Sequence, residues 1–210
     1  YHHVRRAGRR GRRMTLSERT AVFINSMDTC EEPFLEEIYK KASRDAVPVI
    51  RREMCPFLKT VIKIKDPGSI LEIGTAVGFS ALLMASVSRA DCRITTIENY
   101  EKRIADAEKN FKASPWAEKI TLLKGDAGEM LKNCGPRYDL IFLDGAKGQY
   151  ISYLPVLKSF MDKGSLLVCD NVMSGGEIIW SKYLVERRDR TIHKRMREFL
   201  YTLKRDPELS

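Results

Sequence analysis

The sequence predicts an α/β fold, in which a doubly wound, mainly parallel sheet carries helices on both faces. Short apolar segments alternate with segments of helical periodicity along most of the chain. Two of these segments, 138–144 and 164–170, are apolar for most of their length, and each ends in an aspartate. Such segments are typical of central parallel strands covered on both faces. A turn with two glycines at 74–78 follows the first apolar segment and marks a tight connection from strand to helix.

The segments that precede the sheet are expected to be helical from about Ser17. Thr29 and Glu32 have the spacing of a capping box, which predicts a helix that continues to about Arg44. A second helical pattern covers about 48–64. Pro56 should kink or divide this second helix, because proline lacks the backbone N–H that a helix interior uses.

The expected sheet begins after residues 66–68, where Asp, Pro and Gly in succession indicate a turn. Three strands are expected at 69–73, 93–98 and 120–124, and the two segments that end in aspartate bring the number to five. Helices are expected at about 79–89, 100–112 and 150–161. This βα alternation predicts a parallel sheet with right-handed crossovers.

Residues 14–210 are expected to form a single domain, since no internal repeat or low-complexity linker divides them. Residues 1–13 contain six arginines and no acid, so the net charge of +9 leaves only +3 from Met14 onward. This composition predicts a disordered basic extension. An arm that binds nucleic acid is the alternative.

A cytoplasmic protein without a membrane segment is expected. No apolar run is long enough to span a bilayer, and no secretory signal with a hydrophobic core is evident. The five cysteines are odd in number and form no C-x-x-C pair, which indicates reduced and mostly buried thiols.

Asp144, Asp170 and Asn171 are expected at the functional edge of the sheet, because ligands of open α/β sheets bind beyond the carboxyl ends of the strands. Their oxygen atoms suit a hard divalent cation such as Mg²⁺ better than zinc. A cap on the next helix for Asp144, and an Asx turn for the other two residues, are the alternatives. His193 lies among basic residues without a second ligand at metal-binding spacing, so a solvated histidine is expected.

The turn that contains Gly74 and Gly78 lets a ligand approach the backbone closely, although a turn without a ligand is possible. It lacks the G-x-G-x-x-G pattern, which counts against NAD or FAD. Glu98 ends the second strand twenty residues after Gly78, where an acid would bind a ribose diol. With the Gly-Asp-Ala sequence at 125–127, these residues predict an adenosine-binding edge.

Residues 71–80, Glu98, 125–127, 144–147 and 170–171 resemble the metal-dependent O-methyltransferases of the catechol and caffeoyl-CoA type. The resemblance covers about 33–205 and implies a Rossmann-like methyltransferase fold and a homodimer. It also implies S-adenosylmethionine as methyl donor, with Mg²⁺ or another hard divalent cation. The family's sheet has seven strands, so the five expected here predict a chain that lacks its C-terminal strands by truncation.

The resemblance implies a role for each matching residue. The methionine end of the donor would be held by Glu72, Gly74, Thr75 and Ser80. The ribose would be bound by Glu98 and the adenine region by Asp126 and Ala127, while Val49 would close over the donor. The metal would be held by Asp144, Asp170 and Asn171, of which Asp144 also belongs to the donor-binding and catalytic residues. Lys147 would be the general base, unless it is merely an exposed loop lysine.

The acceptor is expected to be tRNA, because the segment 172–199 resembles the bacterial branch that methylates 5-hydroxyuridine at the wobble position to 5-methoxyuridine. Arg188, Arg190 and Arg195 are the expected substrate contacts in the anticodon region. Three alternatives remain open: a small catechol-like or caffeoyl-CoA-like acceptor, a non-catalytic RNA-binding or donor-sensing protein, and a basic helix that is merely solvated.

Overall fold

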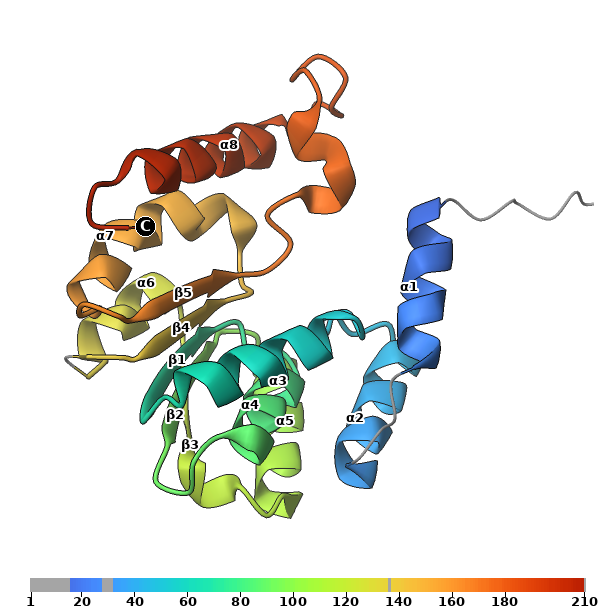
Figure 1. The fold of residues 1–210 in the computed structure, drawn as a ribbon, viewed down its shortest axis with the longest axis vertical. Coiled ribbons are helices and arrows are strands. Elements are labelled where there is room, and N and C mark those ends of the chain that lie inside the picture. Colours follow the sequence, from blue (N-terminus) through green and yellow to red (C-terminus); the bar gives the residue numbers. More distant parts are fainter. Residues whose placement is uncertain (1–15, 28–31, 136, 210) are drawn as a thin grey trace, which may run out of the picture.

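The computed structural model describes residues 16–27, 32–135 and 137–209. Its five strands form one parallel sheet in the order β3-β2-β1-β4-β5 (Figure 1). The strands are β1 (Ser69–Ile73), β2 (Arg93–Glu98), β3 (Ile120–Lys124), β4 (Leu140–Leu143) and β5 (Leu166–Cys169). The strand order runs outward from β1 in both directions, so the predicted doubly wound sheet is confirmed, and the switch point lies between β1 and β4.

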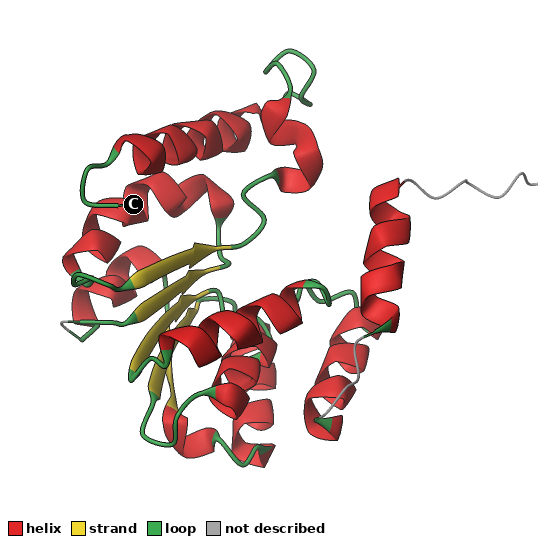
Figure 2. Cartoon of the chain, in the orientation of Figure 1, coloured by secondary structure: helices red, strands yellow, loops and turns green. Residues whose placement is uncertain are grey.

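One face of the sheet is covered by helices from the first half of the chain, as Figure 2 shows. These helices are α3 (Met54–Lys65), α4 (Phe79–Val87) and α5 (Glu101–Ala113). The helix α2 (Pro33–Arg44) packs against α4, and α1 (Leu16–Ser26) extends beyond one end of α2 (Figure 1). The core on this face contains the fully buried Leu58, Ile70 and Met84. Burial of such apolar side chains stabilises the fold by about 1.5 to 3 kcal/mol for each residue.

The other face carries α6 (Ala127–Met130), α7 (Tyr150–Ser159) and α8 (Arg190–Arg205). Four 3₁₀ segments complete the described structure: η1 (Ala117–Lys119), η2 (Leu131–Asn133), η3 (Lys147–Gln149) and η4 (Ser174–Ile179). The core on this face includes Leu71, Ile73 and Phe199. Because side chains alternate along a strand, Leu71 and Ile73 face α7 and α8, while Ile70 faces α3 and α4.

The strand predictions at 69–73, 93–98 and 120–124 are confirmed residue for residue. The prediction of a helix over 48–64 is wrong in its first part, because α3 begins only at Met54. Pro56 neither kinks nor divides this helix. It lies in the first turn, where the backbone N–H groups have no partner within the helix, so a proline there costs little.

The predicted capping box cannot be compared with the structure, since Thr29 lies outside the described residues, as does the predicted extension at 1–13. The helix that the box was expected to open begins at Pro33. Among the described residues, no helix is both long and apolar enough to cross a membrane.

Candidate active site

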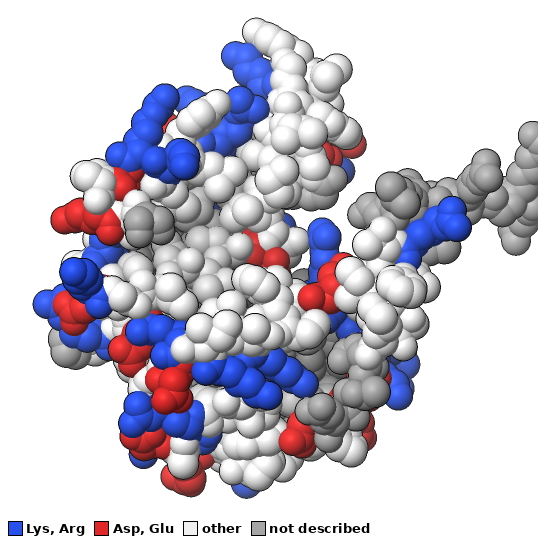
Figure 3. Space-filling view, in the orientation of Figure 1, with Lys and Arg blue, Asp and Glu red and all other residues white. Residues whose placement is uncertain are grey.

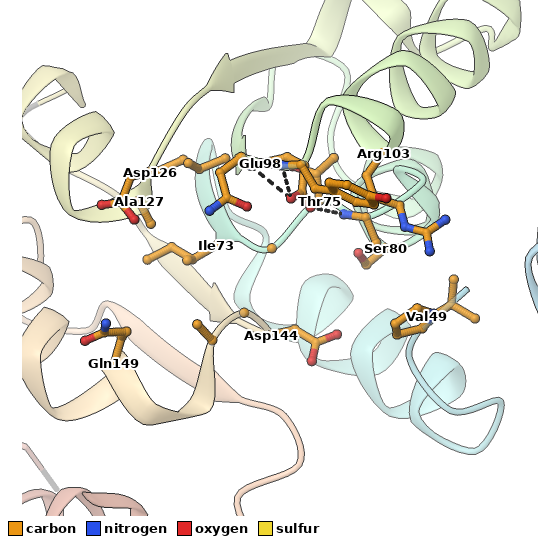
Figure 4. Close-up of a pocket in the computed structure, with 18 of the residues that line it drawn as sticks. Val49, Ile73, Thr75, Ser80, Glu98, Arg103, Asp126, Ala127, Asp144 and Gln149 are labelled. Atoms are coloured by element: carbon orange, nitrogen blue, oxygen red, sulfur yellow. Dashed lines mark hydrogen bonds between the residues drawn. The ribbon is translucent and has the colours of Figure 1, made fainter. Parts of the chain in front are cut away.

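A pocket of about 540 Å³ opens where β1, β2, β3 and β4 end. Figure 4 shows Glu98, Asp126 and Asp144 reaching it from three different strand ends. Every predicted donor-binding residue except Glu72 lines this pocket: Val49, Gly74, Thr75, Ser80, Glu98, Asp126, Ala127 and Asp144. Asn171 lines it as well. The volume lies within the range of about 300 to 1,000 Å³ that is typical of sites for small ligands.

The glycine turn follows β1 and forms one wall of the pocket. Gly74 has a φ of 102°, and a Cβ atom there would lie 2.5 Å from the backbone oxygen of Asp144. No residue other than glycine fits at this position. Ala76 also has a positive φ, of 47°, and its backbone N–H donates to Glu98 Oε2 at 2.8 Å.

Glu98 is held firmly by the backbone around it. Its Oε1 accepts hydrogen bonds from the backbone N–H groups of Asn99, at 2.9 Å, and Tyr100, at 3.0 Å, in addition to the bond from Ala76 to Oε2 (Figure 4). A carboxylate has about four acceptor positions, so these three bonds leave capacity for a ligand hydroxyl. The carboxylate is therefore fixed in place before any ligand binds.

Glu72, which the resemblance expects at the methionine end of the donor, is not among the residues that line the pocket. It is fully buried and accepts hydrogen bonds from Ser80 Oγ at 2.5 Å and Thr96 Oγ1 at 2.6 Å. Thr96 Oγ1 lies 2.6 Å from Thr75 Oγ1. Glu72 therefore orients Ser80 directly and Thr75 through Thr96. Burial raises the pKa of its carboxyl to about 7.

The stability of the protein should fall between about pH 4.5 and 7, because the folded state keeps Glu72 protonated at pH values where the unfolded chain ionises it. The contribution is fully present below pH 4.5 and is lost as the pH rises through about 7. Glu72→Gln stays neutral and should remove about 3 kcal/mol of this pH dependence, at about 1.4 kcal/mol for each pKa unit. Urea unfolding of the metal-free protein at pH 4.5 and 8 measures the difference. Glu118→Gln, an exposed change, is the control, and equal pH dependence in both variants would contradict the prediction.

Asp144 and Asp170 lie next to each other at the carboxyl ends of neighbouring strands. Leu143 pairs with Cys169, so the residue that follows each strand end is an aspartate. Burial, and the charge of Asp170, raise the pKa of Asp144 to about 7. Asp170 Oδ1 accepts from the backbone N–H of Asn171 at 2.6 Å, whereas its Oδ2 is buried without a hydrogen-bond partner among the described residues. A buried acceptor of this kind costs stability unless a ligand meets it.

These residues fit a hard divalent cation, because a cation would neutralise the paired carboxylates and meet the unpartnered oxygen of Asp170. Within the described part of the chain, no group of three or more His, Cys, Asp and Glu residues could hold a metal. An ion here would therefore need the side-chain amide oxygen of Asn171 as its third protein ligand.

Lys147 begins η3, three residues after Asp144, and is partly buried. Its positive charge lowers the pKa of Asp144, against the larger effects of burial and of Asp170, which places the lysine within electrostatic reach of the paired carboxylates. Lys147 does not line the pocket, and neither does Asp170. The predicted base and the buried metal ligand thus lie beside the pocket that holds the predicted donor-binding residues.

None of the predicted substrate arginines lines the pocket. Arg188 is exposed and pairs with Glu186 at 3.1 Å and Asp189 at 3.4 Å. Arg190 donates to the backbone oxygen of Val185 at 3.1 Å, and Arg195 to that of Gly148 at 3.1 Å. Of the three, only Arg195 contacts a residue next to Lys147.

His193 is buried, not solvated as predicted, with 6 % of its surface exposed. The helical pattern of α8 explains the difference, since His193 shares the buried face of this helix with Met196 and Phe199. Neither ring nitrogen has a hydrogen-bond partner among the described residues.

The sequence did not identify several side chains that line the pocket, among them Tyr100, Arg103, Gln149 and Tyr153. Tyr100 and Arg103 follow Glu98 within five residues, at the start of α5. Because ligands of open α/β sheets bind beyond the carboxyl ends of the strands, the closeness of these two residues to the end of β2 could have predicted that they line the pocket. Gln149 and Tyr153 lie one helical turn apart at the start of α7, and no pattern of residue types marked them.

A family model described as O-methyltransferase matches residues 25–210. A catechol O-methyltransferase of Niastella koreensis is 30 % identical over 128 residues, which cover 59 % of this chain and 58 % of that protein. A catechol O-methyltransferase of Mycobacterium tuberculosis is 31 % identical over 111 residues, 52 % of this chain and 50 % of the relative. The chain thus spans about half the length of these two relatives.

The fold is shared with a solved O-methyltransferase of Bacillus cereus in complex with SAH. The TM-score is 0.80 at 22 % sequence identity, and the match covers 90 % of this chain and 86 % of the other. The predicted Rossmann-like methyltransferase fold is confirmed.

Proposed function

Since this chain belongs to the O-methyltransferase family, we propose that it transfers a methyl group from S-adenosylmethionine to a hydroxyl oxygen of a small aromatic acceptor, catechol-like or caffeoyl-CoA-like. One observation carries the proposal. Asp144, which lines the pocket and has Asp170 beside it on the neighbouring strand end, shares this pocket with Glu98, a fixed carboxylate that is available to a ligand. A small acceptor is preferred over tRNA because the relatives named above are catechol O-methyltransferases.

The donor would occupy the pocket along the wall formed by the glycine turn. The free acceptor capacity of Glu98 suits a ribose hydroxyl. Asp126 and Ala127, at the end of β3, would border the adenine. Asp126 also caps α6 through a hydrogen bond from the N–H of Gly128 at 2.9 Å, which fixes its position. Gly74, Thr75 and Ser80 would hold the methionine end, and Val49 would close over it.

The acceptor would lie on the side of the pocket where Asp144 and Asn171 are found. A divalent cation held by Asp144, Asp170 and Asn171 would polarise the acceptor hydroxyl and make it more acidic. Lys147 Nζ would take the proton from this hydroxyl as general base. The acceptor oxygen forms a bond to the methyl carbon while the carbon–sulfur bond of the donor breaks, so the residues must mainly align the two reactants.

Labelled donor and Mg²⁺, supplied with either catechol or tRNA that carries 5-hydroxyuridine, test the proposed acceptor. We expect label in the catechol ether and little in the tRNA. Efficient methylation of tRNA alone would overturn the small-molecule proposal and favour the predicted wobble-uridine activity. No methylation of either acceptor by protein that binds the donor would instead favour a donor-sensing protein. Lys147→Met serves as the control for background transfer.

Glu98→Ala should weaken binding of S-adenosylhomocysteine by about tenfold or more, because a hydrogen bond to a charged group is worth about 1.5 to 3 kcal/mol. Calorimetric titration measures the affinity. The affinity of Glu98→Gln should lie between those of the parent protein and of Glu98→Ala, because the amide keeps one acceptor oxygen. Glu101→Ala, an exposed change in the first turn of α5, is the matched control. Unchanged affinity in Glu98→Ala would remove Glu98 from the donor site.

A further inference from the structure

A second groove, of about 860 Å³, lies between the segment 179–182 and the first half of α8. Its charged lining residues are Lys182, Arg190, Lys194, Arg195, Arg197 and Glu198. We call it the basic groove. Figure 3 shows Lys and Arg side chains gathered over α8 and the neighbouring segment. Five cations against one carboxylate make this groove a site of strong positive potential.

None of the five cations forms an ion pair within the described residues, in contrast to nearby Arg188, which pairs with two acids. All three arginines are nevertheless held in place by backbone oxygens, Arg195 through its bond to Gly148. Arg197 donates to the backbone oxygen of Ile178 at 2.9 Å, and Arg190 to that of Val185 at 3.1 Å. Each guanidinium has five N–H donors, so most donors of the three side chains stay free. Held cations with free donors favour a multiply charged oxyanion.

His193 is the second, independent observation. It lines the basic groove, 6 % of its surface is exposed, and neither ring nitrogen has a hydrogen-bond partner among the described residues. A buried polar group without a partner costs about 1 to 3 kcal/mol. A histidine ring carries at least one N–H in either protonation state, so this side chain can donate to an anion in the groove.

We propose that the basic groove is a binding site for a phosphate group, separate from the methyl-transfer site. Guanidinium groups match the geometry of phosphate oxygens, and lysines add point charges. Trp180 also lines the groove and is 46 % exposed, which gives a nucleobase a surface to stack on. The ligand chemistry is thus a phosphate ester, carried either by a free nucleotide or by an RNA backbone. The proposal does not depend on the acceptor of the methyl group.

Calorimetric titration with inorganic pyrophosphate at low salt tests the site directly. The parent protein should bind pyrophosphate at one site, and Lys194→Gln/Arg197→Gln should weaken binding by about tenfold or more, the equivalent of one lost charge-assisted hydrogen bond. Arg188→Gln is the matched control, since it removes one exposed positive charge outside the groove and should change the affinity less than about twofold. His193→Gln should also weaken binding, and thermal unfolding shows whether that variant is folded. If the His193 variant unfolds, the double variant still tests the site, because Lys194 is exposed and its replacement should not disturb the fold.

Absence of pyrophosphate binding, or equal weakening in Arg188→Gln and the double variant, would overturn the proposal, because the attraction would then be a general surface effect. Two further titrations distinguish the sources of the phosphate. If ADP binds more tightly than pyrophosphate, and Trp180→Ala abolishes this difference, then the ligand of the groove is a free nucleotide. Tighter binding of a short single-stranded RNA than of ADP, weakened in the double variant, would assign an RNA backbone.

Discussion

Replacement of Asp170 by alanine should reduce methyl transfer by at least about 10³-fold, since polarisation by a bound cation is worth several kcal/mol and each 1.36 kcal/mol is a factor of ten in rate. The same variant should lose calorimetric binding of Mg²⁺ or Mn²⁺. The metal-free protein should nevertheless stay folded, and the change should relieve repulsion within the site, since the charge of Asp170 is one cause of the raised pKa of Asp144.

Asp162→Ala is the matched control for this variant. Asp162 lies in the exposed loop before β5, at the opposite end of this strand, and pairs with Arg137 at 2.9 Å. Its replacement should leave metal binding and turnover unchanged. Full activity of protein that has been treated with a chelator, with no metal found by elemental analysis, would show that the carboxylates do not serve a cation.

Lys147→Met should lower kcat by about 10²-fold or more, the usual effect of losing a general base. The affinity for S-adenosylhomocysteine should change little, because Lys147 does not line the donor pocket. The reduction should therefore appear in single-turnover rates at saturating donor, while the donor titration stays that of the parent protein.

Two further measurements make the role of Lys147 specific. Metal affinity must be compared, because removal of the positive charge next to Asp144 also alters the electrostatics of the carboxylates. Lys163→Met, an exposed loop lysine at the other end of β5, is the control for loss of a positive charge. If the Lys147 variant keeps kcat and loses donor affinity instead, then the lysine binds the donor and does not move the proton.

Periodicity alone predicted the sheet well, since β1, β2 and β3 are short apolar segments between turns and begin and end where the sequence indicates. The helix before the sheet was predicted less well. Residues 48–53 have a helical pattern of residue types, but Ile50 is buried in an irregular segment that leads to the pocket. Tertiary packing, which no local pattern reports, decides the conformation there.

The sequence of β1 did not indicate on which face of the sheet Glu72 lies, because a strand that is buried on both faces has no polar side. Alternation along β1 places Glu72 on the same face as Ile70, toward α4, where Ser80 meets it. The donor pocket lies beyond the strand end and not on that face. His193 was misjudged for a related reason, since its basic neighbours in sequence lie on other faces of α8.

The left-handed conformation of Ala76 has a thermodynamic consequence for the affinity of the pocket. For a residue with a side chain, this backbone conformation costs about 1 to 2 kcal/mol of conformational energy. The hydrogen bond from the Ala76 N–H to Glu98 holds Ala76 in this conformation. The turn therefore loses its conformational entropy when the protein folds and not when a ligand arrives. A ligand that binds against a turn already ordered in this way keeps more of its interaction energy as binding free energy.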